Sequence, residues 1–201
     1  MRRNLFTRHG RDASRHIRRG SRWIGACALA ILFASFLLTP TYAQADDPAN
    51  TLILELKHGK VKIKLLPEVA PKHVERVKTL VAEGFYNGIT FHRVIDGFMA
   101  QTGDPTGTGT GGSSYPDLPA EFSEVPFRRG TIGAARTMDP NSANSQFFIC
   151  LGDASHLTGG YTVWGEVVDG MQYVDMIAKG EPPANPDTIV KMYMAADGPG
   201  H

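Results

Sequence analysis

Residues 91–104 read FHRVIDGFMAQTGD, which places one permanent cation, Arg93, and one amide, Gln101, among apolar residues. A single arginine in a strand-like segment normally lies on the solvated side of that strand. Here the neighbouring Phe, Ile and Met residues instead provide apolar walls close to the guanidinium. A fixed and partly desolvated arginine donates stronger hydrogen bonds than a hydrated one. We therefore expect the rest of the chain to be organised around this stretch.

The same stretch resembles a signature of the cyclophilin family of peptidyl-prolyl isomerases, in which FHR, GFM, Q and GD recur in this order. A second block, residues 144–150 (NSQFFIC), is similar to the other signature of that family. The resemblance implies a mainly β fold, a closed eight-stranded antiparallel β-barrel capped by two α-helices. It places one isomerase domain at residues 51–197 and a short tail at residues 198–201.

The alternation of apolar and polar residues independently favours a β fold. Residues 51–57 and 60–66 alternate on either side of His58-Gly59 and predict a two-stranded hairpin. Further strands of apolar residues are expected at residues 90–95, 98–102, 131–135, 145–151, 161–167 and 188–195. Many short strands separated by turn residues are typical of an antiparallel barrel.

Two helices and one long loop complete the predicted elements. One helix begins at Pro71 and ends before Gly84, and a second covers residues 171–179. Residues 104–119 are rich in glycine and contain three prolines, so they predict a long structured loop. No Gly-Lys-Ser/Thr motif follows these glycines, which argues against a phosphate-binding loop.

The first 45 residues differ in composition from the remainder. They contain eight Arg, no Lys and one acidic residue, and an uncharged apolar run at residues 23–38 leads to a small-residue site at 43–45 (AQA). These features predict a signal peptide over residues 1–45, a linker at 46–50, and a periplasmic or secreted protein. The alternative is a membrane anchor formed by residues 23–38, which are short for a span of roughly 20 residues.

Removal of the leader reverses the sign of the net charge. The remaining 13 basic and 19 acidic residues give a formal charge of about −6. An acidic chain lacks the electrostatic basis for binding nucleic acid. Only Cys150 remains, so no internal disulfide is expected. The histidines lack the spacing of metal ligands, so we expect no bound metal. We also expect the protein to be a monomer.

The resemblance assigns Arg93 and Gln101 as the catalytic residues and implies that no cofactor is needed. Arg93 would donate a hydrogen bond to the prolyl nitrogen, and Gln101 would orient Arg93 and meet the peptide backbone. The implied pocket for the proline ring consists of Phe98, Met99, Phe148 and Leu157. The expected function is isomerisation of X-Pro bonds in proline-containing peptides and unfolded polypeptides during folding of exported proteins. The alternative is a catalytically weak peptide-binding or chaperone module on the same fold.

The rim of the implied groove departs from the best-known family members. Thr137 and Tyr161 stand where those members have Asn and His, and Arg136 stands where a small residue is common. We expect Arg136 to narrow the groove beside the proline pocket. His156 occupies the place of a Trp whose ring and indole nitrogen contribute to cyclosporin binding in drug-sensitive members.

We therefore predict weak cyclosporin binding. Because His156 supplies less apolar surface than Trp, inhibition should require micromolar or higher cyclosporin, while isomerase activity is retained. A cyclosporin titration of peptide isomerisation measures this directly, and inhibition at nanomolar concentrations would contradict it.

Overall fold

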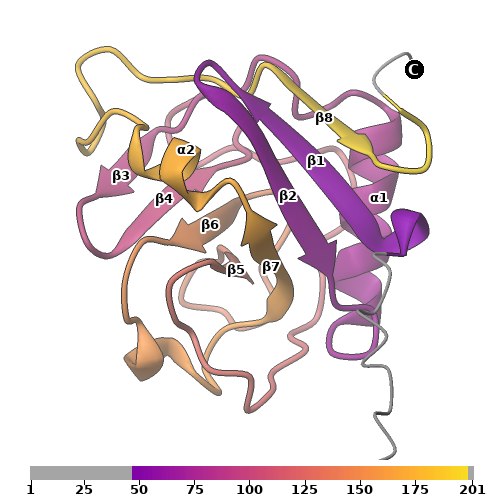
Figure 1. Ribbon diagram of the computed structural model, residues 1–201. Coiled ribbons are helices and arrows are strands. Elements are labelled where there is room, and N and C mark those ends of the chain that lie inside the picture. The colour runs from indigo at the N-terminus through magenta and orange to yellow at the C-terminus, as the bar shows by residue number, and fades with distance from the viewer. Residues whose placement is uncertain (1–46, 199–201) are drawn as a thin grey trace, which may run out of the picture. The chain divides into compact units, whose positions relative to one another are not determined.

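One antiparallel sheet of eight strands organises residues 47–198, which are the residues described by the computed structural model (Figure 1). The strand order is β3-β4-β6-β5-β7-β2-β1-β8. The strands are β1 (Thr51–Leu56), β2 (Gly59–Leu65), β3 (Arg93–Ile95), β4 (Met99–Thr102), β5 (Thr131–Ala134), β6 (Phe147–Cys150), β7 (Val163–Asp169) and β8 (Lys191–Met194). The helical elements are α1 (Pro71–Ala82), α2 (Met171–Asp175) and two 3-10 turns, η1 (Pro48–Asn50) and η2 (Ser155–Leu157).

The predicted mainly β class, with eight antiparallel strands and two α-helices, is confirmed, but the predicted closure of the barrel is wrong. β3 and β8 form the two ends of the strand order and do not pair with each other. Isolated bridges join Thr90 to Thr188 and Val94 to Gly180 instead. Three prolines at residues 182–186 remove ladder donors from this segment, so it covers the edge of β3 as a loop. The sheet is a curled, open half-barrel.

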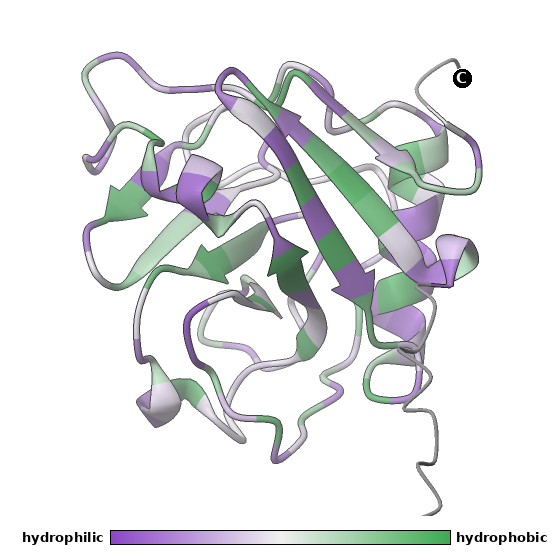
Figure 2. Cartoon of the chain, viewed as in Figure 1, coloured by the Kyte–Doolittle hydropathy of each residue, from purple (hydrophilic) through white to green (hydrophobic). Residues whose placement is uncertain are grey.

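The hairpin of β1 and β2 shows the period-two burial that its sequence predicts. Figure 2 shows hydrophobic and hydrophilic residues alternating along β2, whereas β1 is hydrophobic over residues 52–54 and has a polar residue only at Glu55 in its second half. The side chains that face the core are Leu52, Leu54, Leu56, Val61, Ile63 and Leu65. This alternation fixes the register, since a slip of one residue would turn these side chains to solvent.

The central strands are buried on both faces. On one face Phe147 and Ile149 belong to the main core, together with Trp164 and the apolar side of α1. On the other face Phe148 and Cys150 belong to a second, smaller cluster. These four residues form β6, and burial on both faces explains why the sequence of β6 is a continuous apolar run instead of an alternating one.

The second helix is shorter than predicted. The sequence pattern predicts residues 171–179, whereas α2 ends at Asp175. Beyond the helix the N–H of Ala178 donates to the Asp187 carboxylate over 2.8 Å, and the Lys179 ammonium group donates to the Asp175 carbonyl over 2.6 Å. These contacts satisfy groups that a longer helix would have paired internally.

A distant carboxylate completes the N-terminus of α1. The N-cap residue, Ala70, has no side chain that can accept a hydrogen bond. Glu121 accepts hydrogen bonds from the backbone N–H groups of Lys72 and His73, both over 3.1 Å, and contacts Nδ1 of the His73 ring at 2.6 Å. A carboxylate at this position satisfies free N–H groups and complements the helix dipole. This cap lies 49 residues along the chain from the helix that it closes.

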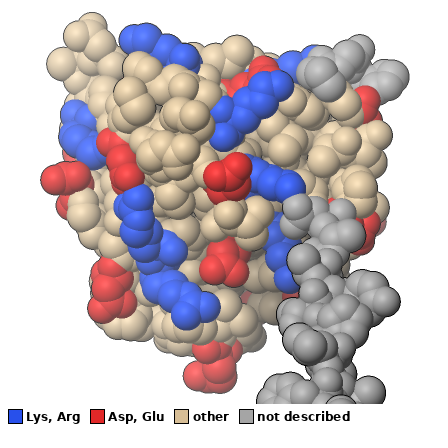
Figure 3. All heavy atoms as spheres, in the orientation of Figure 1, with Lys and Arg blue, Asp and Glu red and all other residues tan. Residues whose placement is uncertain are grey.

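Several predictions about the termini fall on residues outside those described. They are the signal peptide at residues 1–45, the alternative anchor at residues 23–38, and the tail beyond residue 198. Within residues 47–198 no helix has the length and apolar character needed to cross a membrane. Figure 3 shows basic and acidic side chains interspersed over the visible face.

The glycine-rich loop after β4 is held by one buried carboxylate. Asp104 is 1% exposed and accepts hydrogen bonds from the N–H groups of Thr106, Thr108, Gly109 and Gly111, over 2.6 to 3.1 Å. Burial alone would raise the pKa of this carboxyl, but its hydrogen bonds outweigh burial and lower the pKa from 3.8 to about 2. The loop is therefore ordered around the ionised side chain.

We predict that Asp104→Asn destabilises the protein by about 2 kcal/mol at pH 7, because the depressed pKa corresponds to about that much stability. Since the folded-state pKa lies below 3.8, this contribution is present above pH 3.8 and is lost as the pH falls through about 2. Urea unfolding of both proteins should show a stability difference at pH 7 that shrinks at pH 2. The exposed Glu68 provides a control, Glu68→Gln, and equal stability of Asp104→Asn and the parent at pH 7 would refute the assignment.

Candidate functional site

Antiparallel pairing brings the polar residues of the 91–104 stretch into one row across the sheet. Arg93 on β3 pairs with Gln101 on β4, Gln101 pairs with Phe148 on β6, and Phe148 pairs with Gly133 on β5. Residues directly opposite one another on neighbouring strands project from the same face. The register therefore places a cation, an amide and an aromatic ring on one surface.

An apolar pocket of about 250 Å³ opens beside this row. Eight of the ten site residues that the resemblance implied line it, together with Ala135, and they are Arg93, Phe98, Met99, Gln101, Arg136, Phe148, Leu157 and Tyr161. The remaining two, Thr137 and His156, lie outside this pocket. Thr137 lines the neighbouring cavity, and the ring of His156 lies 5.6 Å from that of Phe98. Six of the nine residues that line the apolar pocket are apolar or aromatic, and its volume is large enough for a small apolar ring.

The floor of the pocket is a packed aromatic cluster. Phe127 stacks on Phe148 with ring centroids 5.6 Å apart, and Tyr161 meets Phe148 edge-on at 5.9 Å. A Cβ at Gly133 would lie 2.5 Å from Phe148 and 2.6 Å from Phe127, so the two rings need a glycine beneath them. Phe127 and Gly133 were not among the predicted site residues. Their sequence surroundings give no signal, because they reach the site only through strand pairing and loop packing.

Arg93 is held by a residue that the sequence did not single out. Its Nε donates to Oε2 of Glu181 over 2.7 Å, and the two side chains are 42% and 52% exposed. Within residues 47–198 no hydrogen bond reaches the two Nη groups of Arg93. These groups remain available to a ligand at the edge of the pocket.

The predicted role of Gln101 in orienting Arg93 is not what the structure shows. Although the two residues pair across the strands, the Gln101 amide donates to Oε1 of Gln146 over 3.0 Å. Gln146 in turn donates to the carbonyl oxygens of Gly109 and Gly111, over 3.0 and 2.8 Å. Gln101 thus ties the groove to the glycine-rich loop. Arg93 pairs with Glu181 instead, because a carboxylate is a stronger acceptor for a guanidinium than a neutral amide is.

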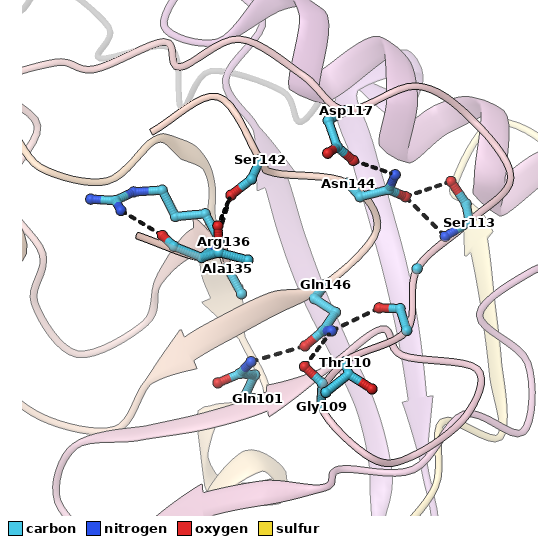
Figure 4. A pocket seen from close by; sticks show the side chains of 13 residues that line it. Gln101, Gly109, Thr110, Ser113, Asp117, Ala135, Arg136, Ser142, Asn144 and Gln146 are labelled. Carbon is cyan, nitrogen blue, oxygen red and sulfur yellow. Dashed lines mark hydrogen bonds between the residues drawn. The ribbon is translucent and has the colours of Figure 1, made fainter. Parts of the chain in front are cut away.

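A second cavity, of about 400 Å³, continues the groove on the side of this glutamine pair (Figure 4). Its walls include several hydrogen-bonded polar side chains. Asn144 accepts hydrogen bonds from the N–H and hydroxyl of Ser113 and donates to Asp117, while Thr137 contacts the Ser142 hydroxyl over 2.7 Å. The cavity shares Gln101 with the apolar pocket, so both open along one groove.

Arg136 forms the wall between these two cavities and lines both. Its guanidinium donates to the carbonyl oxygens of Thr137 and Gly160, both over 2.8 Å, and its centre lies 4.3 Å from the Tyr161 ring centroid. A cation stacked on an aromatic ring and bonded at two points is fixed in place. Arg136 therefore separates the apolar pocket from the second cavity.

The site contains no arrangement suited to proton transfer or nucleophilic attack. Burial raises the pKa of the Cys150 thiol to about 12, so this residue stays protonated in the cluster beneath the pocket. Burial also lowers the pKa of His92, whose ring is nearly enclosed, so the imidazole is neutral near pH 7. Among the described residues no three His, Cys, Asp or Glu side chains gather as a metal site. The site can bind an apolar ring beside the charged hydrogen-bond donor Arg93.

Comparison with known proteins gives one consistent family. A model described as cyclophilin type peptidyl-prolyl cis-trans isomerase/CLD matches residues 51–194. A probable peptidyl-prolyl cis-trans isomerase of Brucella suis is 53% identical over 188 residues, covering 86% of this chain and 96% of that protein. The peptidyl-prolyl cis-trans isomerase-like 3 of Homo sapiens is 45% identical over 125 residues, covering 60% of this chain and 77% of that protein.

Solved structures agree with this result. The cyclophilin AquaCyp293 from Hirschia baltica superposes with a TM-score of 0.70 at 31% identity, covering 75% of this chain and 76% of that one. A cyclophilin type isomerase of Cryptosporidium parvum, determined in the presence of the dipeptide Ala-Pro, superposes with a TM-score of 0.67 at 30% identity. It covers 72% of this chain and 98% of that one.

Proposed function

Because the chain belongs to the cyclophilin-type peptidyl-prolyl cis-trans isomerase family, we propose that it accelerates isomerisation of X-Pro bonds in exported polypeptides while they fold. The observation that carries the assignment of its site is that, within residues 47–198, no hydrogen bond reaches the two Nη groups of Arg93 at the edge of the apolar pocket. The structure of the Cryptosporidium parvum relative was determined in the presence of the dipeptide Ala-Pro, which supports a proline-containing peptide as the ligand of this protein.

The reaction breaks no covalent bond, so the site has to favour a twisted amide. The barrier of about 18–20 kcal/mol is the amide resonance itself. Rotation makes the prolyl nitrogen pyramidal and localises its lone pair, and a hydrogen bond to that nitrogen therefore stabilises the transition state more than the ground state. In our proposal the pocket holds the proline ring, Arg93 supplies this hydrogen bond, and the rest of the peptide rotates.

The other groove residues have binding roles in this proposal. Gln101 meets the peptide backbone from its place beside Gln146. Arg136 and Thr137 limit the space for the residues next to proline, and His156 lies at the rim beside Phe98. No cofactor enters any of these steps, and the protein acts as a monomer.

We predict that Arg93→Ala lowers the rate of isomerisation by about ten- to two-hundredfold, since a charge-assisted hydrogen bond contributes roughly 1.5–3 kcal/mol. Peptide binding should change much less, because the apolar pocket remains. The measurement is turnover of a short Ala-Pro peptide alongside a separate binding assay. Arg128→Ala is the matched control, because Arg128 is an exposed arginine outside the proline pocket.

Two outcomes of that comparison would overturn parts of the proposal. A folded protein that binds the peptide without accelerating isomerisation would be a binding or chaperone module. If the parent protein is active and the Arg93→Ala variant keeps the same rate, Arg93 is not the hydrogen-bond donor. Activity should also vary little with pH near neutrality, because an arginine keeps its proton.

Export is the second part of the proposal and rests on the basic, apolar and small-residue order of residues 1–45. We predict that the protein isolated from bacterial cells begins at Asp46 and is found in the periplasm or medium. N-terminal sequencing of fractionated cells provides the test. A full-length chain in the membrane fraction would favour the anchor at residues 23–38, and a full-length chain in the cytosol would refute export.

A further inference from the structure

The side of Arg93 that faces away from Gln101 is occupied by a segment distant in sequence. Val94 and Gly180 exchange two backbone hydrogen bonds, over 2.8 and 2.9 Å, in an isolated antiparallel bridge. Continuing this antiparallel register by one residue puts Arg93 opposite Glu181. Opposite charges in facing positions of two extended segments attract each other. The contact between Arg93 and Glu181 thus follows from backbone pairing and is not a chance meeting of two surface side chains.

We infer that Glu181 is a positioning residue that aligns Arg93 for isomerisation, an inference that rests on the proposed role of Arg93. The carboxylate binds Nε, which is the guanidinium nitrogen nearest the chain, at 2.7 Å. Fixing Nε defines the plane of the guanidinium and leaves both Nη groups for the ligand. A carboxylate bound to the Nη groups would instead have blocked them.

Positioning matters here because an arginine has many conformers. Its long side chain loses rotamer entropy when it is fixed, and a half-exposed arginine on an edge strand has few contacts that restrict it. Gln101, the neighbour on the other side, is committed to Gln146. Within the described residues Glu181 is therefore the side chain that restrains the Arg93 guanidinium by a hydrogen bond.

The position of Glu181 also relates it to the groove. A third cavity, of about 370 Å³, is lined by Arg93, Gln101, Glu181 and Pro182 and shares the first two with the apolar pocket. Glu181 therefore stands beside the path of a bound peptide without lining the proline pocket itself. Its removal should affect turnover more than the capture of the proline ring.

The expected effect has a modest size and a distinct signature. Glu181→Ala should lower kcat about three- to fivefold with little change in KM, the range that an exposed ion pair supports. Glu181→Gln keeps an acceptor for Nε and should restore part of the loss. In the Arg93→Ala background, Glu181→Ala should cause no further loss, because the group that it positions is absent.

Salt provides a readout that a purely structural role would not move. Because both side chains are partly exposed, about 1 M salt shortens the screening length to roughly 3 Å and weakens their attraction. Raising the salt should lower kcat of the parent toward that of Glu181→Ala, while the variant stays nearly constant. Glu68→Ala is the matched control, since Glu68 is an exposed glutamate outside the three cavities of the groove.

The experiment measures peptide isomerisation, peptide binding and thermal unfolding for the parent, both Glu181 variants, Arg93→Ala and the double variant. An active parent, an impaired Arg93→Ala variant and an unimpaired Glu181→Ala variant would overturn the inference while leaving the proposed function intact. Additive losses in the double variant would also overturn it. If Arg93→Ala itself retained full activity, the proposed role of Arg93 would fail first. Unchanged unfolding temperatures would establish that the variants are folded.

Discussion

The register of four antiparallel strands is the constraint on which the groove depends. It aligns Arg93, Gln101, Phe148 and Gly133 in one row, so that a cation, an amide and an aromatic ring share a face. A slip of one residue between β3 and β4 would turn Arg93 away from the pocket. The sheet therefore sets the backbone positions of these four residues, which suits a reaction in which the protein contributes hydrogen bonds and shape instead of proton transfer.

Two hydrophobic clusters keep this register in place, one on each face of the central strands. The main core lies between the sheet and α1, and the smaller cluster forms the floor of the pocket. Phe148 thus lines the pocket and also packs the protein. The glycine-rich loop is attached to this framework by Asp104 from within and by Gln146 from the groove. Apolar packing therefore supports the floor of the pocket, whereas hydrogen bonds support the glycine-rich loop beside it.

Local patterns predicted the elements well, and the family resemblance named eight of the nine residues that line the apolar pocket, but neither found partners that are distant in sequence. The hairpin of β1 and β2 follows from alternation, and α1 begins at its predicted proline. The predicted closure of the barrel was wrong because a proline-containing segment covers the edge of β3. Arg93 was expected to be oriented by Gln101, yet it pairs with Glu181, 88 residues along the chain. Neither the Glu121 cap of α1 nor the Phe127 floor had a sequence signal.

The sequence by itself determined which segments extend and which coil, because alternation, proline and glycine act within a few residues. The tertiary structure alone decided which side chains restrain one another. Hydrogen bonds and ion pairs require donor and acceptor within about 3 Å, and that proximity depends on strand register and loop path. For this reason the sequence alone singled out Arg93, whereas its carboxylate partner, Glu181, was found only in the folded protein.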